Sequence, residues 1–350
     1  MKTINKWQYD FLVEVFLLFI SIKGRLNFLQ LGRYGNFSEQ HYRNQFNKPF
    51  DFLSFNKELI KDHGGKHLTI AFDPSYIAKS GRSTPGLGYF WSGVASRAKW
   101  GLEISGIAAI DIENHTAFHL EAVQTPNDLK SESLLDHYAH TLIQRKSSLI
   151  EISRYVVADA YFSKYGFVCT LSDHGFEVVS RLRDDADLRY KYTQEQSTGR
   201  GRPRKYDGKV DFNKLKQEHV NLIEESKENK IYQTVVYSKS LKTDINLVIV
   251  YTHKKGRSSH KLYFCTDLEL DPKLLLKYYQ TRFQIEFTFR DAKQHTGMNH
   301  CQERSTDKLH FHWNTSLSNC SKINSTFVFK NHKWLQIYNY KRSTSNSYPI

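Results

Sequence analysis

The sequence predicts an α/β fold: a mixed sheet flanked by helices, preceded by a helical N-terminal region and interrupted by an inserted β-rich subdomain. Two short apolar runs have the form of buried strands, and each ends at a carboxylate, Asp73 or Asp159. The elements around them follow in the order strand, hairpin, helix, strand, helix, strand, which is typical of α/β folds. A polar, strongly charged stretch over 184–260 breaks this order and predicts the insertion.

Residues 1–64 are predicted to be helical. The apolar run 11–22 falls short of the roughly 20 residues that span a bilayer and has no small-residue cleavage site, so we expect a buried helix. Gly32 and Gly35 then separate two short helices, the second capped by Ser38. This pattern fits either a DNA-binding helix-turn-helix or a plain helical subdomain packed on the core.

The first part of the core is predicted over 65–183. The Gly- and aromatic-rich stretch after the first strand is expected to be a loop, and a helix is expected to begin at a cap formed by Asn127 or Ser131. The expected strands are 67–75, 101–111, 116–123, 154–159 and 175–183, and the expected helix carries its apolar side between 134 and 143.

The rest of the chain is divided into three parts. The insertion, 184–260, contains two strand candidates, 231–237 and 245–252. The core resumes over 261–305 with a strand at 261–267. Residues 306–350 form an atypical tail, since Lys308 onward has no Asp or Glu and the last residues show no sustained helical period.

A predicted helix at 274–293 follows the last core strand. Asp271 and Pro272 open it as cap and first-turn proline. At about 100° per residue, four of its polar residues fall within a sector roughly 60° wide; they are Tyr279, Arg282, Glu286 and Lys293. This face is either catalytic or a solvated set of i,i+3 and i,i+4 pairs.

Three carboxylates from separate elements give the catalytic interpretation its chemistry. Asp73 and Asp159 end buried strands, where open α/β sheets place their sites, and Glu286 lies on the helix after the last strand. Such carboxylates would hold two divalent cations about 4 Å apart, which activate a water or a 3′-hydroxyl for in-line phosphoryl displacement. For either aspartate alone, a turn preference is the competing explanation.

Charge and cysteine content point to an intracellular protein with a polyanionic partner. The formal net charge is +14 and the pI is about 9.4, which favours nucleic acid first and an anionic membrane second. The four cysteines are widely spaced without a CxxC pair, which argues against a zinc ribbon or disulfide framework and suits a reducing cytosol.

The spacing Tyr279-x2-Arg282-x3-Glu286-x6-Lys293 resembles the Tyr-Arg-Glu-Lys signature of DDE transposases of bacterial insertion sequences, specifically the IS-four-type group. The contexts of Asp73 and of Asp159-Ala160-Tyr161-Phe162 are similar to the blocks around that group's two aspartates. The resemblance covers roughly 67–305.

This resemblance implies a ribonuclease H-like core that cuts and joins transposon ends with two Mg²⁺ ions, Mn²⁺ being a substitute. It implies Asp73, Asp159 and Glu286 as catalytic metal ligands. Arg282 and Lys293 would contact phosphates of the transposon end, and Tyr279 would hydrogen-bond a nearby phosphate. The implied partners are double-stranded DNA, as inverted-repeat ends and target, and a second copy in a homodimer on DNA. The implied location is the cytoplasm, at the nucleoid, with no membrane partner.

The insertion carries a basic loop, 199–205, with the sequence GRGRPRK. It resembles an AT-hook, whose Arg-Gly-Arg-Pro core lies in the narrow minor groove of A·T-rich DNA. The alternative is a solvated basic loop that adds nonspecific DNA affinity. The residues expected to bind DNA are Arg200, Arg202, Arg204 and Lys205.

Two features depart from the group's pattern. No Trp occurs between Trp100 and Trp313, whereas in the group a Trp of the insertion stacks on a flipped base while a DNA hairpin forms. Either Tyr232 or Tyr237 replaces it or the hairpin step is absent. The likeness also fades after about Cys320, so we expect a truncated or frame-shifted copy. A transposase is therefore weighed against a metal-dependent nuclease without strand transfer and an inactive DNA-binding remnant.

Overall fold

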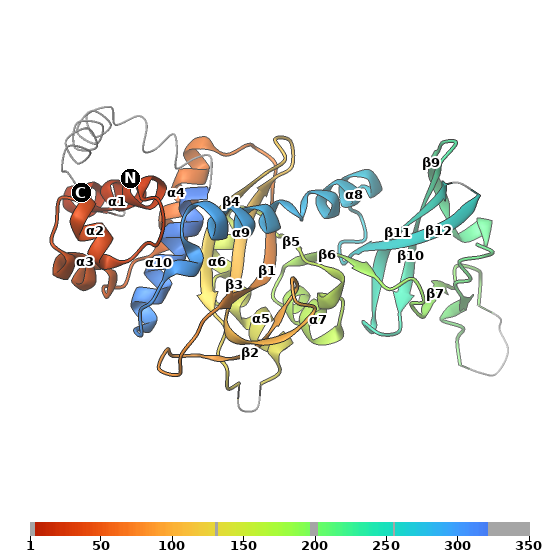
Figure 1. The fold of residues 1–350 in the computed structure, drawn as a ribbon. Coiled ribbons are helices and arrows are strands. Elements are labelled where there is room, and N and C mark those ends of the chain that lie inside the picture. The colour runs from red at the N-terminus through yellow and green to blue at the C-terminus, as the bar shows by residue number, and fades with distance from the viewer. Residues whose placement is uncertain (1–3, 130–131, 197–201, 255, 321–350) are drawn as a thin grey trace.

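The computed structural model describes residues 4–129, 132–196, 202–254 and 256–320. Helices from the N-terminal region lie at one end of the molecule, the sheet and its covering helices fill the middle, and further strands form the other end (Figure 1). The described strands belong to one 12-stranded sheet in the order β2-β3-β1-β5-β6-β12-β11-β10-β7-β8, with β4 on β3 and β9 on β10. Every helix among the described residues is too short or too polar to cross a bilayer.

Five strands form the central part of the sheet. β1 pairs antiparallel with β3, β3 pairs antiparallel with β4, and β5 and β6 continue from β1 in parallel. This order and these directions are those of a ribonuclease H-like sheet, which confirms the predicted fold class. The strands are β1 (Leu68–Ala78), β3 (Arg97–Asp111), β4 (Thr116–Gln124), β5 (Tyr155–Val157) and β6 (Glu177–Leu182).

The charged stretch after β6 forms further strands that extend the same sheet. β12 carries the extension, because one side of it pairs with β6 and the other with β11. The two strand candidates of this stretch are β10 and β11; three short strands were not predicted. The strands are β7 (Leu188–Lys191), β8 (Tyr206–Lys209), β9 (Asn221–Glu225), β10 (Asn229–Ser238), β11 (Thr243–Lys254) and β12 (Arg257–Cys265).

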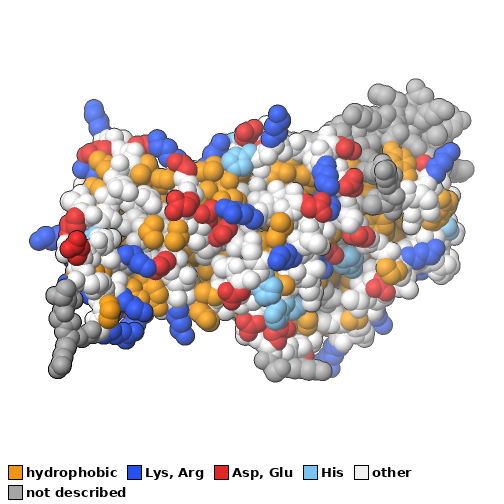
Figure 2. Space-filling view, turned by 180° about the vertical axis from the view of Figure 1, so that it is seen from behind, with side chains coloured by type: hydrophobic (Ala, Val, Ile, Leu, Met, Phe, Trp, Pro, Cys, Tyr) orange, Lys and Arg blue, Asp and Glu red, His pale blue; other side chains and the backbone are white. Residues whose placement is uncertain are grey.

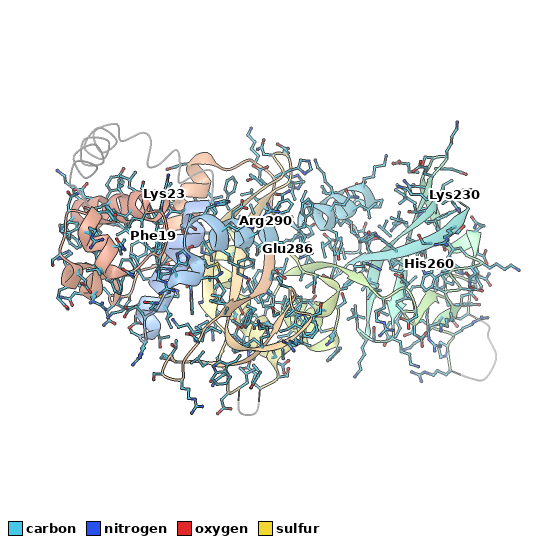
Figure 3. All side chains as sticks on the ribbon, viewed as in Figure 1. Phe19, Lys23, Lys230, His260, Glu286 and Arg290 are labelled. Atoms are coloured by element: carbon cyan, nitrogen blue, oxygen red, sulfur yellow. The ribbon has the colours of Figure 1, made fainter. Side chains whose placement is uncertain are left out.

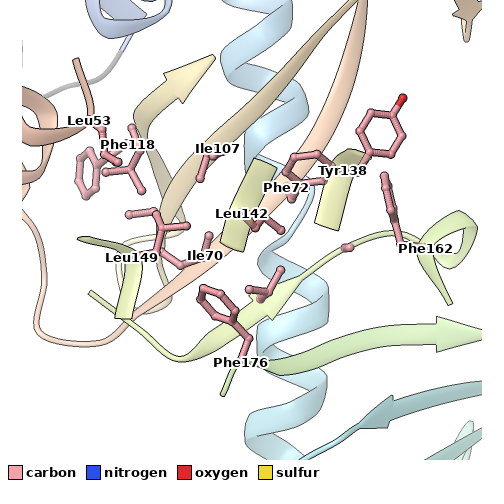
Figure 4. Packing of buried hydrophobic residues seen from close by; sticks show 14 of the residues in the cluster. Leu53, Ile70, Phe72, Ile107, Phe118, Tyr138, Leu142, Leu149, Phe162 and Phe176 are labelled. Carbon is pink, nitrogen blue, oxygen red and sulfur yellow. The ribbon is translucent and has the colours of Figure 1, made fainter. Parts of the chain in front are cut away.

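Helices cover both faces of the central sheet. One buried cluster joins the N-terminal helices and α5 to α7 to one face, and part of it is shown in Figure 4. A second cluster joins α8 to α10 to the opposite face. The helices are α1 (Lys6–Ser21), α2 (Phe28–Tyr34), α3 (Glu39–Phe46), α4 (Phe52–His63), α5 (Leu134–Ile143), α6 (Lys146–Ile150), α7 (Tyr165–Asp173), α8 (Pro272–Thr281), α9 (Gln284–His295) and α10 (Thr306–Cys320).

Helix caps explain several of these boundaries. The Asn5 side chain accepts a hydrogen bond from the Gln8 N–H while the Gln8 side chain accepts one from the Asn5 N–H, a capping box that starts α1. Ser38 caps α3 as predicted. The prediction for α5 was wrong: the cap is Ser133, which accepts from the Asp136 N–H.

The loop predicted after the first strand contains an element. Residues 88–92 form β2 (Gly88–Ser92), which pairs antiparallel with Arg97–Gly101 of β3. Gly and Ser at both ends of this run gave it the composition of a loop. Its strand character comes from pairing with β3, a contact that local pattern does not contain.

The predicted helix at 274–293 is two helices. α8 ends at Thr281 and α9 begins at Gln284, and the junction has i→i−3 hydrogen bonds, from Arg282 N to Tyr279 O (3.2 Å) and from Glu286 N to Phe283 O (3.0 Å). Such a tighter turn rotates each residue by about 120° instead of 100°. No Gly or Pro marks the break, so the sequence did not reveal it.

The first fifteen residues of the predicted tail form α10, which is buried over most of its length. It packs on α1, α9 and β4 and links the N-terminal helices to the central sheet. The remaining tail, 321–350, on which the truncation hypothesis depends, lies outside the described residues.

Candidate active site

Asp73 lies in the middle of β1 rather than at its end. The strand continues past it to Ala78, because β3 stays paired along the whole length and Asp73 faces Gly106. The prediction of a strand end was therefore wrong for β1 as a whole. It holds with respect to the parallel neighbour, β5. The pairing of β5 with β1 stops at Ala71↔Val157. Asp73 thus stands just beyond the carboxyl end of β5, at the edge where α/β sheets place ligands.

Asp159 follows β5 by two residues, as predicted. Its Oδ1 accepts a hydrogen bond of 2.8 Å from the Tyr161 N–H and so caps a short 3-10 helix, Ala160–Phe162. The Ser180 hydroxyl of β6 donates to the Asp159 carbonyl oxygen at 2.8 Å. Two elements therefore fix the backbone that carries this carboxylate at the same sheet edge as Asp73.

Glu286 lies in the first turn of α9 and pairs with Arg282 at the junction with α8. The distance from Arg282 Nη2 to Glu286 Oε1 is 2.6 Å, with the arginine side chain 13% exposed and the glutamate 51%. The Glu286 end of α9 lies in the middle of the molecule, between the N-terminal helices and the strands of the insertion (Figure 3). The predicted face survives the helix break at these two residues.

Lys293 reaches from α9 to β1. Its Nζ donates to Ser75 Oγ and to the Tyr76 carbonyl oxygen, both at 2.8 Å. Burial lowers the pKa of Lys293, and the charge of Asp73 opposes that shift. Lys293 is therefore held against β1 at Ser75, two residues after Asp73.

Tyr279 and one arginine that the sequence pattern did not single out complete the cluster. The Tyr279 ring packs against Tyr263, with centroids 5.0 Å apart. Burial raises the pKa of Tyr279, while the charges of Arg282 and of Arg181 on β6 lower it. Arg181 is the basic residue of the strand sequence EVVSRL, next to the buried Leu182, and a cation at this place in a strand was the signal that could have found it.

The charges around Asp73 interact strongly. Burial raises its pKa to about 7, the nearby Arg282 guanidinium lowers it, and the carboxylates of Asp159, Glu286 and Glu103 raise it. For Arg282, burial lowers the pKa, but the Glu286 hydrogen bond and the Glu286 and Asp73 charges raise it overall. Asp73, Asp159, Glu286 and Arg282 therefore form one electrostatic unit at the sheet edge.

A stability test follows from the pKa of Asp73. Its carboxyl has an ordinary pKa of 3.8 and about 7 in the folded protein, so ionised Asp73 destabilises the fold and stability falls as pH rises through this window. Asp73→Asn removes that penalty, on the order of 4 kcal/mol at most. Without divalent ions, the melting temperature of Asp73→Asn should exceed that of the wild type by more at pH 8 than at pH 5. For an Asp291→Asn control on the surface of α9, the difference in melting temperature from the wild type should be the same at both pH values. The same result for Asp73→Asn would contradict the assigned pKa.

The three carboxylates suit divalent ions by donor type, because they offer hard oxygen ligands. The pKa of one of them, Asp73, is raised, and a bound cation would lower it. In the described residues the oxygens of the three carboxylates do not form a compact group within 4.8 Å, unlike Asp207, Glu218 and His219 in the insertion. That compact group is already neutralised: Lys216 Nζ lies 2.9 Å and Arg204 Nη2 3.0 Å from Asp207 carboxylate oxygens. We therefore do not assign a metal to it.

The basic loop lies only partly within the described structure. Arg200 falls outside the described residues, whereas Arg202, Arg204 and Lys205 are exposed. Arg204 is tied down at the base of the loop by its ion pair with Asp207 and lies over the Tyr192 ring, 5.1 Å from the centroid. The described part of the loop, 202–205, leads into β8, which lies beyond β10 in the sheet order and so far from the carboxylate cluster.

Comparison with known proteins gives a family match and similarity to solved structures. A family model described as the transposase DDE domain matches residues 104–318. The matched range contains Asp159, Glu286 and most of α10, and it begins after Asp73. A cryo-EM structure of the piggyBac transposase synaptic complex with hairpin DNA is similar over 97% of this chain and 67% of that chain, with a TM-score of 0.42 and 11% identity. No curated protein matches the chain.

Proposed function

This chain belongs to the transposase DDE domain family, whose enzymes transfer phosphoryl groups on DNA, and we propose that it binds the inverted-repeat ends of a mobile element, cuts them and joins them to target DNA. The finer assignment is to the IS-four-type group with the Tyr-Arg-Glu-Lys signature. We also propose that the protein acts on DNA ends as a homodimer and that 184–260 is a subdomain inserted into the catalytic core.

One observation carries the proposal. Carboxylates from three separate segments, Asp73, Asp159 and Glu286, interact electrostatically at one sheet edge, with Arg282 among them. A structural ion pair needs one acid for each base. Three acids gathered together, one of them with its pKa raised to about 7, are costly for the fold, and such clusters are typical of sites that bind cations.

Two Mg²⁺ ions, with Mn²⁺ as a substitute, would be held by Asp73, Asp159 and Glu286. Bound there, they would activate the attacking oxygen and stabilise the leaving oxygen of an in-line displacement. To bind a metal ion, Glu286 must share its carboxylate with Arg282 or break the ion pair with it. The Glu286 side chain is 51% exposed, so it has room to rotate. The ions would then add to the positive charge of Arg282 beside Asp73 and favour the ionised form of its carboxyl.

The cations beside the carboxylates would hold the DNA backbone. Arg282 has a buried Nη1 group with no hydrogen-bond partner in the described structure, so a phosphate oxygen would satisfy a donor that is otherwise costly to bury. Lys293 would contribute a second positive charge from the β1 side, and Tyr279 a phenol. These residues orient the scissile phosphate and leave the reacting oxygens to the carboxylate side.

Binding of long DNA would draw on charge that is spread over the molecule. Figure 2 shows Lys and Arg side chains distributed over the whole of one face, interspersed with acidic ones, rather than gathered in one patch. The net charge of +14 therefore supports a general attraction for DNA. Specific contacts must come from local sites.

The test uses DNA that carries the short inverted repeats flanking the gene. With Mg²⁺ the protein is expected to cut the repeat ends and, given pre-cut ends and a target plasmid, to join them; with EDTA it should do neither. Cutting without joining would indicate a nuclease. Binding of the repeats without cutting would indicate an inactive DNA-binding remnant, and both results contradict a transposase.

A second test concerns the basic loop. Deleting 199–205 removes four cations, and each cation that pairs with a phosphate adds about 0.9 to the steepness of log affinity against log salt. We expect weaker binding to A·T-rich duplex DNA and a shallower slope. The matched control replaces the same residues with a Gly-Ser loop of equal length, which keeps the connection and removes the charge. If neither variant changed affinity or slope, the loop would have no role in DNA binding.

A further inference from the structure

An arm of the sheet outside the carboxylate site exposes three large aromatic rings. This β2–β3 arm consists of β2 and the residues of β3 that pair with it, 88–101. Tyr89 is 74% exposed, Trp91 63% and Trp100 41%. Large rings of this kind are usually buried, so a concentration of three on one short hairpin marks a surface that binds something.

The three rings share one face of the arm. Tyr89 is directly opposite Trp100 and Trp91 is opposite Ala98, and opposite residues of an antiparallel pair point to the same side. Tyr89 and Trp100 touch edge to face, with centroids 5.4 Å apart. The three rings therefore lie on one face of the arm as an aromatic strip, in which Tyr89 and Trp100 touch.

The strip continues the sheet face that carries the candidate active site. Asp73 and Ile77 lie on the same side of β1, because side chains alternate along a strand. Ile77 is opposite Leu102, whose side chain lies on the side of Trp100, two residues earlier in β3. Leu102 belongs to the buried cluster that α9 shares with this face. A strand of DNA leaving the site along β3 would meet the nearest ring of the arm, Trp100, six residues before Gly106 in the chain, roughly 20 Å away.

The charge of the segment around the arm indicates which kind of partner the strip binds. From Lys79 to Leu102 the sequence has no acidic residue and four cations. Arg97 and Lys99 are exposed on the arm, with no ion pair in the described structure. They alternate with Ala98 and Trp100 along β3, so their side chains point to the face of the arm opposite the rings. A two-stranded arm with aromatic rings on one face and unpaired cations on the other suits a nucleic-acid strand, whose bases stack on the rings and whose phosphates pair with the cations.

We propose that the β2–β3 arm binds unpaired DNA, with the rings of Tyr89, Trp91 and Trp100 stacking on bases and Arg97 and Lys99 contacting the backbone. This inference rests on the proposed function, since it takes DNA as the substrate. Duplex DNA hides its base faces within the stack, so the strip discriminates in favour of an opened or single strand. The arm would hold such a strand near the site where ends are cut or joined.

Trp91 is the best position to test, since its side chain has no ring contact in the described structure, whereas Trp100 also donates from Nε1 to the Gly81 carbonyl oxygen (3.2 Å). The probes are a labelled 20-residue oligothymidylate and a hairpin duplex of equal charge. Trp91→Ala is expected to weaken oligothymidylate binding by about tenfold and Trp91→Phe by less, because phenylalanine keeps a stacking face. Duplex affinity should stay unchanged in both.

The cations of the arm have their own signature. Replacing Arg97 and Lys99 with glutamine should reduce the salt slope for oligothymidylate by about 1.4, or 0.7 for each phosphate that they neutralise. Circular dichroism melting of every variant controls for folding. Unchanged oligothymidylate affinity in Trp91→Ala and in the Tyr89→Ala, Trp91→Ala double variant would overturn the proposal. Loss of a protein dimer on mutation of Trp91 would also overturn the proposal, because it would show that a second copy covers the strip.

The outcome can be separated from that of the proposed function. A protein that fails to cut or join repeat ends but binds oligothymidylate through Trp91 would refute the transposase activity and keep the arm. A protein that cuts repeat ends while Trp91→Ala binds oligothymidylate normally would refute the arm alone.

Discussion

Replacing Glu286 with alanine is expected to reduce Mg²⁺-dependent cleavage of transposon ends by roughly a thousandfold or more. The change removes one of three carboxylates, and metal-ion stabilisation of the displaced oxygens is worth several kcal/mol, with each 1.36 kcal/mol equal to a factor of ten in rate. Binding of the ends should persist, because the cations proposed to hold phosphates remain. Single-turnover cleavage and a mobility-shift measurement on the same DNA report the two quantities.

Asp291→Ala is the matched control for this variant. Asp291 is a carboxylate on the same helix, 46% exposed and paired with Arg290, so its loss removes equal charge from the same element. Its cleavage rate should stay within a few-fold of the wild type. Cleavage retained by Glu286→Ala would remove Glu286 from the metal site, and equal loss in both variants would point to charge rather than ligation.

Replacing Trp313 with alanine is expected to destabilise the fold by about 3 to 5 kcal/mol. Trp313 is 1% exposed in the middle of α10, where it packs in the buried cluster with Leu309 and Leu317. Truncating a fully buried tryptophan loses its transfer free energy and leaves a cavity. Because α10 links the N-terminal helices to the central sheet, urea unfolding should show one transition at a lower midpoint.

Asp307→Asn, an exposed change in the first turn of the same helix, serves as control and should cost about 1 kcal/mol or less. A Trp313→Ala variant with wild-type stability would show that α10 does not contribute to the core. A variant that lost only part of its helical signal in a separate early transition would show that the N-terminal helices unfold independently of the sheet.

Local pattern was sufficient for most of the central sheet. β3, β4, β5 and β6 are apolar runs bounded by turn residues, and their burial in a covered sheet leaves that signature in the sequence. β2 was missed because its strand form depends on pairing with β3. The break between α8 and α9 was missed because its residues remain in right-handed helical conformations, with no Gly or Pro to mark it.

The site also has features that the sequence indicated and features that it did not. Residue types and spacing indicated the carboxylates and the polar face of 274–293, because helical periodicity fixes which side chains neighbour each other. Two features depended on tertiary packing and could not be predicted: the hydrogen bond from Lys293 to Ser75 and the raised pKa of Asp73. The position of Asp73 within β1 also required knowledge of where β5 stops.

Anomalous scattering from a crystal grown with Mn²⁺ above pH 7, where Asp73 is ionised, tests most directly whether the three carboxylates at the sheet edge bind divalent cations. We expect anomalous peaks within about 2 Å of carboxylate oxygens of Asp73 and of Asp159 or Glu286. Mn²⁺ bound only at Asp207, Glu218 and His219, with no peak beside Asp73, would contradict this expectation.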